Sequence, residues 1–123
     1  MVKILYDNYF RINQICYVLI GSIPGALLRW QINNDFWSNV FGAAFLGIIA
    51  GVKCSQTLQL FFIIGFCGSL TTFSGWMLAS FELLLKGFIL QSFFLILGTF
   101  VSGFLALIIG FLMGKKLRQA FLP

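Results

Sequence analysis

Four long apolar runs, separated by short polar stretches, organise this sequence. They cover residues 12–30, 36–52, 57–85 and 88–114. Each run is about as long as the 20 residues or so that a helix needs to cross the hydrocarbon core of a bilayer. The pattern therefore predicts that residues 1–123 form a single all-α integral membrane domain with four transmembrane helices.

The third run differs from the others in its middle. Between Gly65 and Gly75 it contains three glycines and four hydroxyl-bearing residues, all of which are unfavourable in helix interiors. The run is also longer than one straight crossing requires. We predict a helix broken near Gly68 to Thr72; the alternative is a continuous helix with a packing face of small residues. Where a helix is broken at membrane depth, the backbone N–H and C=O groups must find hydrogen-bond partners in the protein or line a cavity.

Composition supports a membrane location for the whole chain. Hydrophobic residues make up 60% of it and charged residues only 9%, too few to cover a soluble domain. The eight bases lie between the apolar runs, as membrane-edge anchors do, rather than on one nucleic-acid-binding patch. Four crossings return the chain to its starting side. The side that holds both termini then carries six of the eight bases. These six are Lys3, Arg11, Lys53, Lys115, Lys116 and Arg118, against Arg29 and Lys86 opposite.

This charge bias places both termini in the cytoplasm. The first apolar run starts only after a polar stretch, so no cleavable signal peptide is expected.

Glycines four residues apart predict close helix packing; the pairs are Gly21 and Gly25, Gly47 and Gly51, and Gly110 and Gly114. Three cysteines without metal or redox spacing are interpreted as apolar filler; they are Cys16, Cys54 and Cys67.

The candidate functional residues are uncharged hydrogen-bond donors within the apolar runs. They are Asn39, the segment Ser69–Ser74, Thr99 and Ser102. A strongly hydrated anion enters a membrane only if such donors replace its water, and a fixed central cation would bind it too tightly for conduction. Phe73 and Trp76 could add electropositive ring edges. Each residue also has a structural interpretation: Asn39 could cap a helix, the hydroxyls could bond their own backbone, and the aromatic pair could simply pack.

The run from Gly65 to Ser74 closely resembles the signature of the Fluc/CrcB fluoride channels. The segment Gly25–Trp30 and the spacing of Asn39, Gly42 and Gly47 are similar to the same family, so the resemblance covers all four runs. Four positions depart from the family pattern. Trp76 replaces a phenylalanine, Gly75 replaces a threonine, Asp35 lies near the place of another threonine, and a family acid is displaced to Glu82.

The resemblance implies a dual-topology dimer of antiparallel subunits in the bacterial plasma (inner) membrane, with two fluoride pores. It implies a structural sodium ion at the dimer centre, bound by the backbone carbonyls of Gly68 and Thr71 from both subunits. It assigns the fluoride path to Asn39, Phe73, Trp76, Thr99 and Ser102, and a vestibule to Arg29. The donor pattern of the third run adds Thr72 and Ser74 to this path. The implied role is passive fluoride export that lowers cytoplasmic fluoride.

Three other functions stay open at this point. The lopsided charge distribution is unusual for a subunit that inserts both ways, so the chain could be one half of a heterodimer with a paralogue. A small proton-coupled multidrug transporter would need a carboxylate in the first run, and residues 12–30 contain none. A non-transporting subunit of a membrane complex would explain the glycines but not the donor set. With no His, no acid pair and no phosphate-binding loop, an enzyme is not expected.

Overall fold

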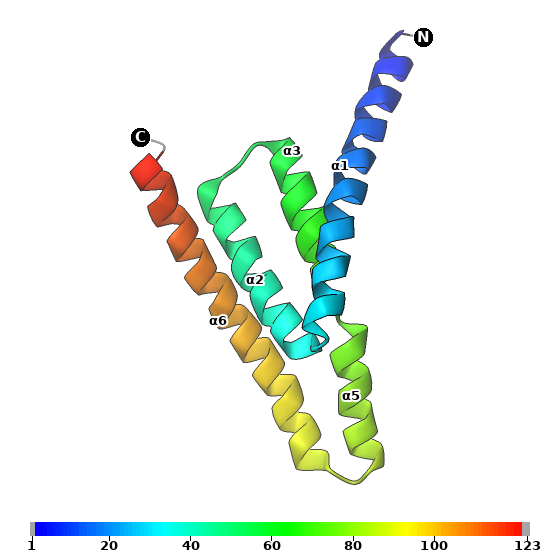
Figure 1. The fold of residues 1–123 in the computed structure, drawn as a ribbon, viewed down its shortest axis with the longest axis vertical. Coiled ribbons are helices and arrows are strands. Elements are labelled where there is room, and N and C mark those ends of the chain that lie inside the picture. Colours follow the sequence, from blue (N-terminus) through cyan, green and yellow to red (C-terminus); the bar gives the residue numbers. More distant parts are fainter. Residues whose placement is uncertain (1, 122–123) are drawn as a thin grey trace.

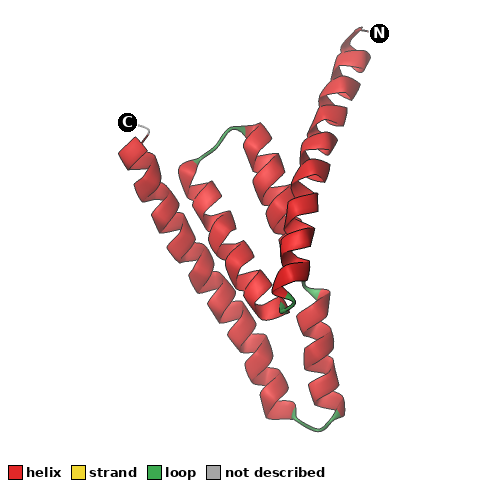
Figure 2. Ribbon diagram, viewed as in Figure 1, coloured by secondary structure: helices red, strands yellow, loops and turns green. Residues whose placement is uncertain are grey.

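A computed structural model describes the backbone of residues 2–121 and the side chains from Arg11 to Phe121. The described chain is helical apart from short turns (Figures 1 and 2). The elements are α1 (Val2–Ile32), α2 (Asp35–Val52), α3 (Gln56–Gln59), the π-helix η1 (Leu60–Cys67), α4 (Gly68–Leu70), α5 (Ser74–Leu85) and α6 (Ile89–Phe121). The side chain of Lys3, one of the six bases assigned to the terminal side, lies outside the described residues.

Four segments are long and apolar enough to cross a membrane, as the hydrophobic pattern predicted. They are Arg11–Ile32, Asp35–Val52, Gln56–Leu85 and Ile89–Phe121. The start of α1 and the end of α6 lie at the same end of the molecule (Figure 1). Large apolar side chains such as Leu19, Leu78 and Phe104 are exposed on the subunit surface, where lipid or a partner subunit can cover them. The chain is a multi-pass membrane protein.

The third span is interrupted, and the interruption lies slightly later than predicted. Gly68, Ser69 and Leu70 are still helical, whereas Thr71 is extended, with φ −82° and ψ 154°. The helix resumes at Ser74, so the break covers residues 71–73 rather than 68–72. The eight residues before α4 form the π-helix η1, which the sequence pattern did not predict. π-Turns are rare and often occur near functional sites.

Glycines bring the helices together in two close pairs. A Cβ atom at Gly47 or Gly110 would overlap the backbone of the opposite helix in the α2–α6 pair. The same holds for Gly21 and Gly65 between α1 and η1. The predicted packing role of the glycines is therefore confirmed, because only a residue without a side chain permits this approach. Figure 1 shows α2 and α6 running alongside each other.

We expect Gly110→Ala to destabilise the subunit by about 1–3 kcal/mol, the usual cost of overpacking a tight contact. The added methyl would meet the Ala44 carbonyl, which α2 cannot easily move. Gly98→Ala is the matched control on the same helix, because nothing lies within 4 Å of its Cβ position. Thermal unfolding in detergent measures both variants. Equal melting temperatures for the two would contradict the close α2–α6 contact.

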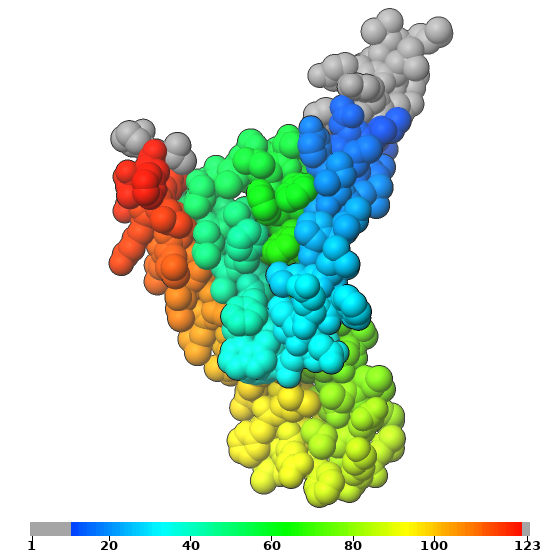
Figure 3. All heavy atoms as spheres, in the orientation of Figure 1, coloured from blue at the N-terminus to red at the C-terminus, as the bar shows by residue number. Residues whose placement is uncertain are grey.

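The turn between α1 and α2 lies at the depth of the break in the third span. Asp35, the first residue of α2, contacts Gly75 in the first turn of α5. The hairpin of α5 and the start of α6 extends well past this turn (Figure 3). The polar residues Asn33 and Asn34 are thereby placed next to the interrupted segment rather than at the outer end of the bundle.

Candidate functional site

Asn39 holds the break in place through both ends of its side-chain amide. Its Nδ2 donates to the Thr72 carbonyl at 2.9 Å, and its Oδ1 accepts the Thr72 N–H at 2.7 Å. The amide thus pairs with the exposed peptide groups of Thr72 as a neighbouring β-strand would. Without it, these groups would lose their partners at membrane depth, where unpaired backbone is costly.

At the break, two backbone carbonyls of the third span lose their regular helical donors. In a continuous helix, the Thr72 N–H would donate to Gly68, and the Gly75 N–H would donate to Thr71. Here the Thr72 N–H binds Asn39, and the Gly75 N–H donates to the Thr72 hydroxyl at 3.4 Å. The regular helical donors of the Gly68 and Thr71 carbonyls are therefore diverted to side chains. These are the two carbonyls to which the resemblance assigns sodium.

One side of the break opens into an apolar groove of about 380 Å³ between α2, α5 and α6. Four of the predicted path residues line it: Asn39, Phe73, Trp76 and Thr99. Thr72, Ser74 and Ser102 are not among its lining residues. The structure thus gathers residues from three spans into one surface and leaves three of the predicted residues beside it.

Three aromatic rings form a continuous edge-to-face series along this groove. The centroids of Phe73 and Trp76 are 5.2 Å apart at 82°, and those of Trp76 and Phe100 are 5.4 Å apart at 83°. Phe73 is 66% exposed, whereas Trp76 is only 5% exposed. Trp76 is therefore held by packing, while Phe73 presents its ring outside the subunit. Sequence reasoning missed Phe100, which follows Thr99 and resembles the other exposed phenylalanines of α6.

The hydroxyl groups have partners within their own helices. Thr99 donates to the Leu95 carbonyl at 2.8 Å, and Ser102 donates to the Gly98 carbonyl at 2.6 Å. The alternative that these side chains bond their own backbone is correct for this conformation, so a donor track along α6 would require rotation of both hydroxyls. Thr72 uses its oxygen to cap the first turn of α5.

Ser38 is a second residue that sequence reasoning did not single out. It is fully buried, and its Oγ is the one buried side-chain polar atom without a hydrogen-bond partner among the described residues. By helical spacing it lies on the face of α2 that carries Asp35, Asn39 and Gly42. That face is turned toward the break, since all three of these residues contact positions between Leu70 and Gly75. Ser38 therefore keeps a free donor on this face.

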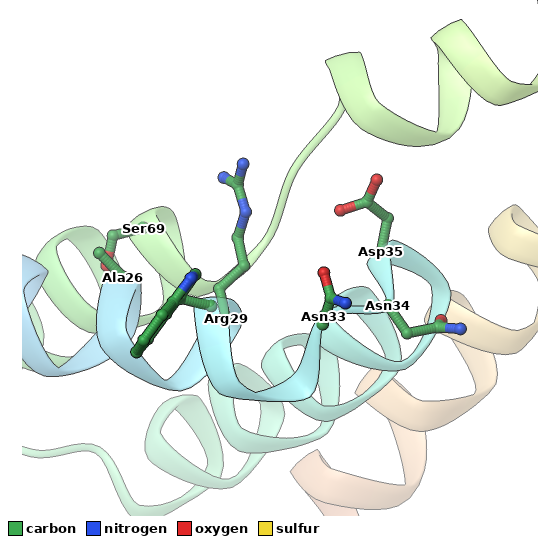
Figure 4. Close-up of a pocket in the computed structure, with 7 residues that line it drawn as sticks. Ala26, Arg29, Asn33, Asn34, Asp35 and Ser69 are labelled. Carbon is green, nitrogen blue, oxygen red and sulfur yellow. The ribbon is translucent and has the colours of Figure 1, made fainter.

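Arg29 lies apart from the groove, in a pocket of about 480 Å³. This pocket is lined by Ala26, Arg29, Trp30, Asn33, Asn34, Asp35 and Ser69. Figure 4 shows the Arg29 and Asp35 side chains projecting to the same side of the α1–α2 turn, toward the connection between α4 and α5. The resemblance predicted Arg29 near a vestibule, and an open polar pocket surrounds it.

Comparison with known proteins decides the family. The family described as "CrcB-like protein, Camphor Resistance (CrcB)" matches residues 16–111. The chain belongs to the CrcB family. Among its relatives is "Fluoride-specific ion channel FluC 1" of Prochlorococcus marinus (strain SARG), 46% identical over 110 residues and 89% of each chain. "Fluoride-specific ion channel FluC 2" of Prochlorococcus marinus (strain MIT 9313) is 43% identical over 110 residues, again 89% of each chain.

A third CrcB relative extends the similarity slightly. "Fluoride-specific ion channel FluC 2" of Synechococcus sp. (strain CC9902) is 43% identical over 117 residues, which cover 91% of this chain and 87% of the relative. The family match over residues 16–111 includes the break and reaches into all four spans. The groove and the Arg29 pocket therefore lie within the matched residues.

Proposed function

We propose that this CrcB chain is a fluoride-specific ion channel that lowers cytoplasmic fluoride by passive export across a bacterial plasma membrane. The observation that carries the proposal is the groove beside the broken span, in a chain whose relatives are named fluoride-specific channels. Export of this kind is useful because hydrogen fluoride crosses lipid as a neutral acid and ionises inside, so the trapped anion needs an exit.

The groove offers what a dehydrated small anion requires. The second N–H of the Asn39 amide is not used in its pairing with Thr72, and the hydroxyl of Thr99 can rotate from its own backbone. The positive edges of Phe73 and Trp76 add favourable contacts without a charged group. Such neutral partners bind an ion strongly enough to admit it and weakly enough to release it.

The proposed channel is a dimer of antiparallel subunits with a pore along each groove. Three observations support a partner on this face. The groove is open on its outer side, Phe73 projects from the subunit, and Cβ atoms at Gly68 and Gly103 would meet almost nothing within 4 Å. Helical glycines without an internal packing role are expected where another subunit approaches closely.

A structural sodium ion at the dimer centre is the second part of the proposal. The Gly68 and Thr71 carbonyls, whose regular donors bind side chains instead, would hold it together with their copies in the partner. Neutral oxygens of this type suit a hard monovalent cation. When bound, the ion would stabilise the freed carbonyls and add a positive field that does not titrate.

Each of the three alternatives makes its own prediction. If a paralogue is required, the purified chain alone will not conduct, and addition of the paralogue will restore flux. A small multidrug-type transporter would show proton-coupled transport, although residues 12–30 contain no carboxylate. A non-transporting subunit would carry no flux in either combination.

Fluoride efflux from liposomes that contain only this purified chain tests the proposal directly. Fluoride should leave when a potassium ionophore removes the opposing voltage, and chloride should not replace it. Efflux from the single polypeptide would also make the paralogue unnecessary. Absence of flux with and without a paralogue would overturn the channel assignment.

Phe73→Ile should lower the fluoride flux roughly two- to tenfold, the factor that corresponds to an aromatic edge contact of about 0.5–1.5 kcal/mol. The dimer should still assemble, because isoleucine keeps an apolar side chain at this exposed position. Phe93→Ile is the matched control, since this exposed phenylalanine of α6 does not line the groove. Unchanged flux in Phe73→Ile would place the ion path elsewhere.

A further inference from the structure

The pocket around Arg29 contains a carboxylate next to the break, at the opposite side of the break from the groove. Asp35 is half-buried at the start of α2 and lines this pocket together with Arg29 and Asn34. Arg29 and Asp35 are the charged residues of its lining. Figure 4 shows them projecting to the same side of the turn.

The position of Asp35 depends on a glycine in the third span. Both carboxylate oxygens of Asp35 lie against the position that a Cβ atom at Gly75 would take, so a residue with any side chain there would displace the carboxylate. This contact connects two departures from the family pattern, the acid at position 35 and the glycine at position 75. Gly75 therefore provides the space that Asp35 occupies.

Asp35 is placed where it opposes an approaching anion. Gly75 belongs to the first turn of α5, whose N-terminal end would otherwise attract negative charge. The carboxylate contacts this end and offsets the single positive charge of Arg29 across the same pocket. An anion that reaches the break from this side consequently meets a pocket whose lining has no net charge.

We infer that the Arg29 pocket is an entrance to the break, where Asp35 restrains fluoride capture and so sets the rate at low fluoride. The inference rests on the proposed fluoride channel. One unit charge about 7 Å from an ion in a water-filled pocket changes its local concentration about threefold at low ionic strength. The effect should nearly vanish at about 1 M salt, where the Debye length is only about 3 Å.

Two variants that change the charge of the pocket in opposite directions test the inference in the intact channel. Asp35→Asn keeps the shape beside Gly75 and removes the charge. Asn34→Asp adds a charge to the same pocket, and an aspartate can keep the helix cap that Asn34 makes to the Trp37 N–H. Initial fluoride flux is measured in liposomes at sub-saturating fluoride, in about 10 mM and about 1 M sodium gluconate.

We expect Asp35→Asn to raise the flux about threefold and Asn34→Asp to lower it about threefold in dilute salt, with both differences lost in concentrated salt. Glu82→Gln is the control, since it removes the same charge from an exposed site on α5 outside the pocket. If the Asp35→Asn protein fails to assemble, the flux of Asn34→Asp in dilute and concentrated salt tests the inference by itself. Wild-type flux in both variants, or changes that persist at high salt, would overturn the inference. An inactive wild-type channel would instead overturn the proposed function, and this inference with it.

Discussion

Replacement of Asn39 by leucine is expected to remove both the channel activity and most of the folded protein. Leucine has nearly the same shape but leaves the Thr72 N–H and carbonyl without partners. Each unpaired buried group costs about 1–3 kcal/mol, so the folded state loses about 2–6 kcal/mol. Even 2 kcal/mol corresponds to about a thirtyfold smaller folded-to-unfolded ratio. Fluoride flux per total protein and the detergent melting temperature should fall together.

The specific role of Asn39 is separated from a general effect by two further variants. Asn13→Leu makes the same replacement in α1, away from the break, and should leave both measurements near wild type. Asn39→Asp retains the acceptor for the Thr72 N–H but loses the donor to its carbonyl, so it should be intermediate in stability and still conduct poorly. An Asn39→Leu protein with a wild-type melting temperature would show that the break does not need this amide.

Gly68→Val is expected to give a folded subunit that no longer forms the channel. The subunit itself tolerates the change, since the nearest atom to a Cβ at Gly68 is the Ile63 carbonyl oxygen at 3.9 Å and its φ is −62°. In the proposed dimer, however, the valine would push against the partner and the shared sodium site. An overpacking cost of about 1–3 kcal/mol weakens association about five- to 150-fold.

The dimer equilibrium of Gly68→Val is measured in detergent by size-exclusion chromatography with light scattering, alongside fluoride flux. Gly21→Val provides the contrast, because its side chain would overlap the Phe61 backbone within the subunit and should prevent folding altogether. A Gly68→Val protein that dimerises and conducts like the wild type would show that this face of the break has no close partner.

The sequence predicted the architecture well because membrane helices are determined by local properties. Length and hydropathy identify each span, and glycines four apart identify the tight α1–η1 and α2–α6 contacts. The break was also predicted, but its first residue was placed at Gly68 instead of Thr71. Its exact position depends on where Asn39 meets the third span, a contact between residues 33 positions apart.

The site was less predictable than the fold, because the roles of its residues depend on such distant contacts. Asn39 was identified as a donor for the anion, whereas the structure shows that most of its amide holds the backbone of Thr72. Gly75 and Asp35 each departed from the family pattern for no evident reason. Only their contact across two spans shows that the glycine accommodates the acid.

The depth of the α1–α2 turn also affects how the membrane potential acts on the protein. Water that entered the Arg29 pocket would reach the level of the break, while α5 continues for 12 residues, or roughly 18 Å, beyond it. The electric field would then act mainly across the rest of the path, which contains less water. A fluoride ion would cross most of the voltage, worth about 2.3 kcal/mol per 100 mV, within a few steps past Phe73.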